Sequence, residues 1–239
     1  MRPSPIQPRR RACAPILVLA GLVLAGAPAV AEDAVCPPGA AERAARAIQA
    51  RYEHIRDLEA DFEQTNRSAS FEGEPLMSPE PRSGHVVFAK PGRMRWSYLA
   101  PERSIVVSNG RILWIHDVDA ESITRMEVTS GFLSGAALQF LLGDGQILET
   151  FEVDALACPG DRIELRLRPR EEATYERLGL LADRGTGDVV GTSVVDLFGN
   201  RTDIRFSATR VNQDPKPSTF ELEIPEGVEV IDYAGAPTN

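Results

Sequence analysis

The chain has 239 residues, of which 26% are charged and 43% are hydrophobic, a composition typical of a folded globular protein rather than a disordered one. Its 35 acidic residues outnumber its 26 basic residues, and the formal net charge is −9. A surface of this sign repels phosphate backbones, so we expect no nucleic-acid partner, and it disfavours adsorption onto anionic lipid headgroups.

The first 31 residues have the plan of a secretory signal peptide. Arg9 to Arg11 form a basic segment, residues 16–25 are apolar or small, and Ala29-Val30-Ala31 matches the A-x-A cleavage pattern. A membrane anchor is the alternative, but the apolar run is shorter than the roughly 20 residues that a membrane-spanning helix needs. We therefore expect residues 1–31 to be cleaved and residues 32–239 to be exported as one soluble domain.

Two cysteines, Cys36 and Cys158, remain once this segment is removed. An even pair in an oxidising compartment predicts a disulfide, and two free thiols are the alternative. On the chain-entropy model, closing so long a loop would stabilise the folded state by about 4–5 kcal/mol.

The apolar pattern predicts one helix followed by many strands. Residues 40–57 place apolar side chains three and four positions apart, which is typical of an amphipathic helix, and Pro37-Pro38-Gly39 precedes it. The apolar period then changes to two, which predicts eleven strands that begin at Leu58 and continue at about residues 84–90, 93–99, 104–109, 111–117, 121–128, 147–154, 161–168, 178–184, 188–196 and 201–210. Short turns, among them the strong hairpin signal Asn109-Gly110, predict a mainly β, antiparallel sheet that curls.

One apolar segment interrupts the strand pattern. Residues 132–142 (FLSGAALQFLL) have the length of a short helix, contain no charge and are apolar nearly all round. Such a helix, laid across a curled sheet, encloses an apolar space that either side chains or a ligand must fill. Aromatic residues make up only 6% of the chain, which favours the ligand.

The sequence offers little sign of catalysis. It has no metal-binding H-E-x-x-H motif, no G-x-S-x-G nucleophile motif, no P-loop and no dinucleotide fingerprint. Asp117, Asp119 and Glu121 could bind a cation in one turn, but acidic turns are usually solvated and no further ligands lie nearby in the sequence. We expect no enzymatic activity, no cofactor and no metal site.

Four segments, taken in order, resemble a known family. They are residues 58–65 (LEADFEQT), 89–96 (AKPGRMRW), 101–114 (PERSIVVSNGRILW) and 220–228 (FELEIPEGV). Together they are similar to the LolA-type periplasmic carriers of outer-membrane lipoproteins, over roughly residues 40–232. The resemblance implies an unclosed antiparallel half-barrel of about eleven strands, with the N-terminal helix and the short apolar helix as a lid over an apolar cavity.

The resemblance also implies a function. An inner-membrane ABC complex would release an acylated lipoprotein to the carrier, which would shield the acyl chains across the periplasm and pass them to an outer-membrane acceptor. We expect the carrier to be a monomer. Relatives with this fold also bind other lipids or glycolipids, or act as interaction modules in periplasmic stress signalling, and these remain the alternatives.

The resemblance assigns roles to individual residues. Lys90 occupies the position of a basic residue that holds the lid closed in the family, where the best-known members have Arg; a solvated turn lysine is the alternative. Met94 and Trp96 match apolar residues on the cavity side, although ordinary core packing would also explain them. Further candidates for the cavity wall come from strand alternation and from the apolar helix, and they are Tyr98, Ile112, Trp114, Phe132, Leu133, Leu138 and Phe140. The long loop 66–82 departs from the family pattern and could be a flap, a partner contact or a disordered loop.

Overall fold

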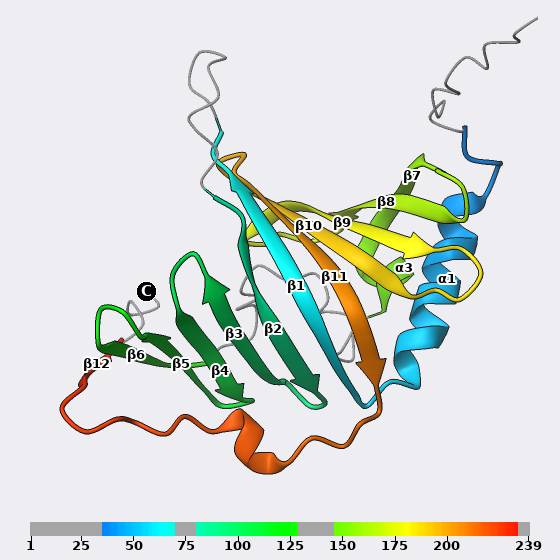
Figure 1. Ribbon diagram of the computed structural model, residues 1–239. Coiled ribbons are helices and arrows are strands. Elements are labelled where there is room, and N and C mark those ends of the chain that lie inside the picture. Colours follow the sequence, from blue (N-terminus) through cyan, green and yellow to red (C-terminus); the bar gives the residue numbers. More distant parts are fainter. Residues whose placement is uncertain (1–34, 70–79, 129–145, 234–239) are drawn as a thin grey trace, which may run out of the picture. The chain divides into compact units, whose positions relative to one another are not determined.

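The computed structural model describes residues 35–69, 80–128 and 146–233 of the chain (Figure 1). All of them belong to one compact unit, Glu32–Asn239. The expected signal peptide and the expected apolar helix at 132–142 lie outside the described residues. Among the residues that are described, no helix is both long and apolar enough to span a membrane.

Helix α1 (Ala40–Glu53) forms where the amphipathic period predicts it and buries the face that carries Ala44, Ile48 and Tyr52. It ends four residues before the expected position because the backbone that follows has other partners. The N–H of Arg56 donates to Asn212 Oδ1, and the carbonyl oxygen of Arg56 accepts from the N–H of Lys90, both at 2.8 Å. These bonds direct the chain into the first strand.

Within the described ranges, twelve strands form one sheet, in the order β12-β6-β5-β4-β3-β2-β1-β11-β10-β9-β8-β7. Their bounds are β1 (Asp57–Arg67), β2 (Arg82–Ala89), β3 (Arg93–Ala100), β4 (Ser104–Asn109), β5 (Ile112–Asp117), β6 (Ser122–Glu127), β7 (Phe151–Ala157), β8 (Arg162–Pro169), β9 (Tyr175–Asp183), β10 (Val189–Asp196), β11 (Arg201–Val211) and β12 (Glu229–Asp232). All neighbours pair antiparallel except β12, which lies parallel to β6. Because the two edge strands, β12 and β7, do not pair with each other, the sheet is an unclosed half-barrel, as predicted.

Two details correct the expected strand pattern. The segment at 147–154 begins as a short helix, α3 (Ile147–Thr150), because the side chain of Gln49 on α1 accepts a hydrogen bond from the N–H of Ile147 at 3.0 Å and stabilises a turn there. The twelfth strand, β12, was not expected because four residues are too few to show alternation.

The two faces of the sheet have different coverings. The inner face, defined here as the face that carries Met94 and Trp96, forms the main hydrophobic core together with α1, which lies beside β7 (Figure 1). On the outer face, Phe220 of the 3-10 helix η1 (Pro217–Phe220) is buried against Val87 and Ala89. The segment after β11 therefore contacts the outer face through η1 and then runs past the ends of the strands to β12 (Figure 1).

A disulfide joins Cys36, just before α1, to Cys158, just after β7, with their Cα atoms 5.2 Å apart. This is the disulfide that the sequence predicts from the two cysteines that follow the first 31 residues. The bond fastens the beginning of α1 to the β7–β8 turn.

Candidate functional site

The inner face of β1 to β5 is an ordered apolar wall. Directly opposite residues of an antiparallel pair share a face, so the pairing register assigns each side chain to one side of the sheet. Met94 on β3 lies between Phe88 on β2 and Ser108 on β4. Trp96 lies one row further along, between Val86 and Val106. Met94 is 1% exposed and Trp96 is 3% exposed, so this wall is continuous with the hydrophobic core.

Trp96 is the centre of an aromatic cluster on this wall. The ring of Phe62 meets it edge-on with centroids 4.8 Å apart, and the ring of Phe88 does the same at 5.5 Å. The ring of Phe206 on β11, which pairs with Phe62, lies 6.5 Å from the Trp96 ring and is tilted by 47° to it. Gly84 makes room for the cluster, because a Cβ at that position would lie 2.0 Å from the carbonyl oxygen of Ser97 and 3.0 Å from the Phe62 ring.

Tyr98 marks the end of the apolar wall. It lies on the inner face, and its hydroxyl donates a hydrogen bond to Gln64 Oε1 at 2.9 Å. Its ring meets Phe62 edge-on at 5.0 Å, so one side of Tyr98 is apolar and the other is polar. Burial raises the pKa of the Tyr98 hydroxyl above its ordinary value, and the charge of Arg82 opposes this rise.

The register corrects two of the candidates on β5. Leu113 pairs with Ser108 and Ile115 pairs with Val106, so these two residues share the inner face with Met94 and Trp96. Ile112 and Trp114, which the sequence had placed on the cavity wall, therefore lie on the outer face. The missed residues, Leu113 and Ile115, could have been found from the lengths of the two hairpin turns, which fix which residues face each other.

Lys90 contacts the end of α1. Its Nζ donates to the backbone carbonyl oxygen of Tyr52 at 2.8 Å, so the β2–β3 turn is bonded to the last turn of the helix. Helix α1 is one of the two helices expected to form the lid, and the other, the apolar helix at 132–142, lies outside the described residues. The four candidates on that helix, Phe132, Leu133, Leu138 and Phe140, lie outside them too.

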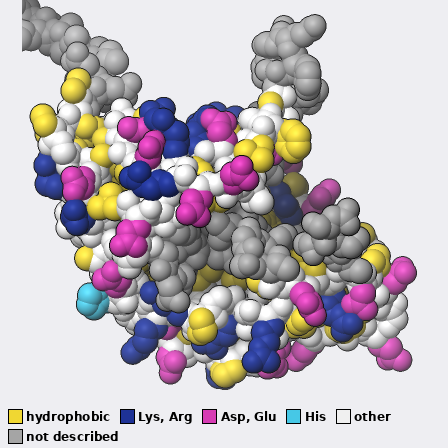
Figure 2. All heavy atoms as spheres, turned by 180° about the vertical axis from the view of Figure 1, so that it is seen from behind, with side chains coloured by type: hydrophobic (Ala, Val, Ile, Leu, Met, Phe, Trp, Pro, Cys, Tyr) yellow, Lys and Arg dark blue, Asp and Glu magenta, His cyan; other side chains and the backbone are white. Residues whose placement is uncertain are grey.

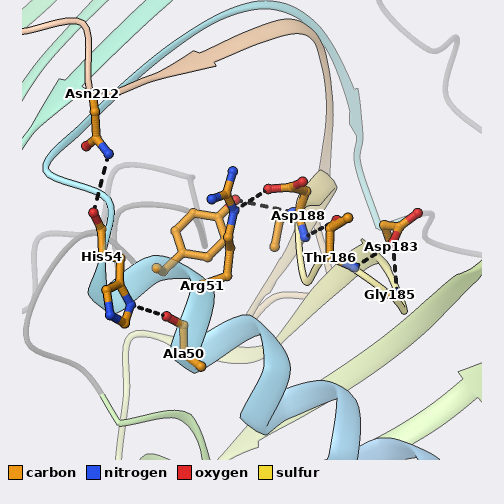
Figure 3. Close-up of polar contacts among 10 residues, drawn as sticks. Ala50, Arg51, His54, Asp183, Gly185, Thr186, Asp188 and Asn212 are labelled. Carbon is orange, nitrogen blue, oxygen red and sulfur yellow. Dashed lines mark hydrogen bonds and ion pairs between the residues drawn. The ribbon is translucent and has the colours of Figure 1, made fainter.

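Other polar contacts fix the same end of α1 to the far half of the sheet (Figure 3). Arg51 Nε donates to Asp188 Oδ1 at 2.7 Å, and Asn212 Nδ2 donates to the carbonyl oxygen of His54 at 3.4 Å. Asp183 shapes the β9–β10 turn that presents Asp188, since its Oδ1 accepts from two backbone N–H groups, and these bonds lower the pKa of its carboxyl group.

The acidic turn at 117–121 uses its carboxylates internally. Both oxygens of Asp119 accept hydrogen bonds from Arg103, which lower the pKa of the Asp119 carboxyl group. Asp117 Oδ1 accepts from the N–H of Ala120 at 2.9 Å. Within the described part of the chain, no group of three or more His, Cys, Asp or Glu residues is arranged to hold a metal ion.

The exposed surface has a different character from the wall. Figure 2, which shows the side of the molecule that faces away from the viewer in Figure 1, has basic and acidic side chains interspersed over the described residues. A groove of about 340 Å³ across β8 to β11 and β1 is lined by charged residues of both signs, including Glu63, Arg67, Asp203 and Arg205. Such a groove suits polar ligands, whereas the aromatic inner face suits alkyl chains, because burying apolar area there is favourable.

A family model and relatives similar in sequence point to one family. Residues 53–223 match the family model described as "Outer membrane lipoprotein carrier protein LolA". The outer-membrane lipoprotein carrier protein of Alkalilimnicola ehrlichii is 32% identical over 207 residues, covering 85% of this chain and 91% of that protein. The protein of the same name from Azotobacter vinelandii is 30% identical over 200 residues, covering 83% and 92%. The crystal structure of a putative outer membrane lipoprotein-sorting protein domain from Vibrio parahaemolyticus is 13% identical, with a TM-score of 0.43 over 75% of this chain and 95% of that one.

Proposed function

Because this chain belongs to the LolA family of outer-membrane lipoprotein carrier proteins, we propose that it shields the acyl chains of lipoproteins and carries them from the inner to the outer membrane. The inner face of the half-barrel is the surface that binds the acyl chains. Met94 and Trp96 contribute the centre of that surface, with Phe62 and Ile115 beside them.

The observation that supports this assignment is that the strand register aligns apolar side chains on the inner face. Three consecutive rows across β1, β2 and β3 contain Leu58, Phe88 and Met94, then Ala60, Val86 and Trp96, then Phe62, Gly84 and Tyr98. Each methylene of an acyl chain costs about 0.8 kcal/mol in water, so a chain of about fifteen methylenes costs on the order of 12 kcal/mol. A carrier must offset most of this cost and still release its cargo, which requires an apolar wall with a covering that moves.

The proposal places the protein in the periplasm. Residues 1–31 would direct export and be cleaved, and the remaining chain would be soluble. Its partners would be an inner-membrane ABC complex that loads it and an outer-membrane acceptor that unloads it. Loading and unloading change no covalent bond, so the proposed activity is non-enzymatic and needs no cofactor.

The direct test is to purify the protein gently from its native host and identify what it carries by mass spectrometry. We expect an acylated lipoprotein in complex with the protein, and release of that lipoprotein from inner-membrane vesicles only when the protein is added. Protein that is free of acylated molecules, and that releases nothing from the vesicles, would count against the proposal.

A further inference from the structure

The inner face changes from apolar to polar at the end where β1 finishes and β2 begins. Along β1 the wall runs from Leu58 to Gln64, about 20 Å of extended strand. The last apolar row on this face contains Phe62, Gly84 and Tyr98. In the next row, Gln64 on β1 pairs with Arg82 on β2. This end of the wall therefore replaces apolar side chains with an amide and a guanidinium group.

These polar side chains form one connected array. Tyr98 Oη donates to Gln64 Oε1 at 2.9 Å, and Gln64 Nε2 donates to Asn66 Oδ1 at 3.0 Å. The Arg82 guanidinium lies over the Tyr98 ring, 3.9 Å from its centroid, and its Nη2 donates to Ser104 Oγ at 3.0 Å. Stacking and hydrogen bonding together fix the orientation of the guanidinium group before any ligand arrives.

Arg82 forms no ion pair within the part of the chain that the structure describes. Arg51, Arg103 and Arg125 each pair with an aspartate, as expected in a chain with more acids than bases. Among the described residues, no carboxylate forms an ion pair with Arg82, and its side-chain partners are a hydroxyl group and an aromatic ring. A guanidinium group has five N–H donors, so donors remain for further acceptor oxygens.

We propose that Arg82, Tyr98 and Gln64 form a subsite for the polar end of the acylated cargo, an inference that rests on the proposed function above. The ligand chemistry is a set of hydrogen-bond-accepting oxygens at the polar end of acyl chains. The ester and amide carbonyls of an acylated cysteine supply such oxygens, and so does the phosphate of an anionic phospholipid. The acyl chains would follow the wall from Tyr98 towards Met94, and the oxygens would meet Arg82 at its polar end.

The test compares three probes on the purified protein. A tripalmitoylated cysteinyl peptide has neutral carbonyl acceptors, phosphatidylglycerol has an anionic phosphate, and the hydrocarbon dye diphenylhexatriene has no oxygen. Arg82→Gln should weaken binding of at least one of the two oxygen-bearing probes about tenfold, the usual effect of losing a charge-assisted hydrogen bond. Diphenylhexatriene should bind the variant within about twofold of the original protein.

Matched variants separate recognition from folding. Arg205→Gln removes an exposed arginine on the outer face of β11 and should leave all three affinities unchanged. Tyr98→Phe deletes one oxygen from the array and should weaken the same oxygen-bearing probe, which keeps the test valid if Arg82→Gln does not fold. A larger loss for the peptide identifies lipoprotein carbonyls as the ligand, and a larger loss for phosphatidylglycerol identifies a phosphate.

Two outcomes would overturn the subsite while leaving the carrier function intact. One is equal weakening of all three probes, which would make Arg82 a packing residue, and the other is no weakening of any probe. If the original protein binds none of the three, the proposed function fails and the subsite fails with it.

Discussion

Lys90 Nζ and the carbonyl oxygen of Tyr52 lie 2.8 Å apart, and this hydrogen bond joins the β2–β3 turn to the last turn of α1. The Tyr52 carbonyl oxygen also accepts from the N–H of Ile55 at 3.3 Å, and a cation is favourable at that end of the helix dipole. The disulfide between Cys36 and Cys158 fastens the other end of α1. The helix is therefore held at both ends, and the Lys90 bond is one of the contacts at its C-terminal end that a single substitution removes.

We predict that Lys90→Leu loosens the last turn of α1 and changes cargo release more than cargo uptake. Losing a hydrogen bond from a charged group should cost about 1–2 kcal/mol of stability. Amide hydrogen exchange would show faster exchange in the last turn of α1, and transfer kinetics would show the altered release.

Lys216→Leu is the matched control for that prediction. Lys216 is the chain's other lysine and is exposed just before η1. If both variants give the same transfer kinetics as the original protein, Lys90 has no part in the mechanism.

Adjacent residues on β5 provide a sharper test of which face binds acyl chains. Ile115 and Trp114 are both half-buried, but the register places Ile115 on the inner face and Trp114 on the outer face. We predict that Ile115→Gln lowers the affinity for an acylated peptide by about tenfold, because an amide facing an alkyl chain loses its hydrogen bonds to water. Trp114→Gln should leave this affinity within about twofold, as measured by displacement of a hydrophobic dye. A larger loss for Trp114→Gln would place the binding surface on the other side of the sheet.

The same strand shows where sequence reasoning reaches its limit. Period-two patterns located eleven of the twelve strands because each strand keeps one side in the core. On β4 to β6, however, the outer face also buries apolar residues, with Val107 and Ile123 both 0% exposed. When both faces are apolar, alternation no longer distinguishes them, and the cavity side of Trp114 could not be decided from its own strand.

Other features depend on contacts that are distant in the sequence. The turn of α3 is held by Gln49, 98 residues before Ile147. The polar array that includes Gln64 and Arg82 brings together β1 and β2, which residues 68–81 separate in the sequence. No local pattern marks either contact, whereas the prediction for Met94 and Trp96 rests on a family motif that includes them.

The disulfide should make a large contribution to stability. We predict that replacing Cys36 and Cys158 together by Ser lowers the free energy of unfolding by about 4–5 kcal/mol, because the bond closes a long loop in the unfolded chain. Chemical denaturation would measure the loss, and added reductant should lower the stability of the original protein but not of the variant. Two alkylatable thiols in the unreduced mature protein, detected by mass, would contradict this prediction.

Tyr52 should govern part of the loss of stability at alkaline pH. The side chain is 2% exposed, and its Oη accepts a hydrogen bond from the N–H of Val189 at 3.2 Å. Burial raises the pKa of the Tyr52 hydroxyl well above its ordinary value. Because the pKa of Tyr52 is higher in the folded than in the unfolded protein, its full contribution to the free energy of unfolding is present below the unfolded-state pKa of about 10. That contribution is lost as the pH rises above this value.

We therefore predict two effects of Tyr52→Phe. At neutral pH the variant should be less stable by about 1–3 kcal/mol, because the buried N–H of Val189 loses its acceptor. Above pH of about 10, the free energy of unfolding of the variant should fall less steeply with pH than that of the original protein. Some dependence on pH should remain, because burial also raises the pKa values of Tyr98 and Tyr175. Denaturant unfolding at a series of pH values measures both effects, with Tyr233→Phe as the control because Tyr233 is 59% exposed. Identical alkaline slopes in the original protein and in Tyr52→Phe would show that Tyr52 does not resist ionisation in the folded state.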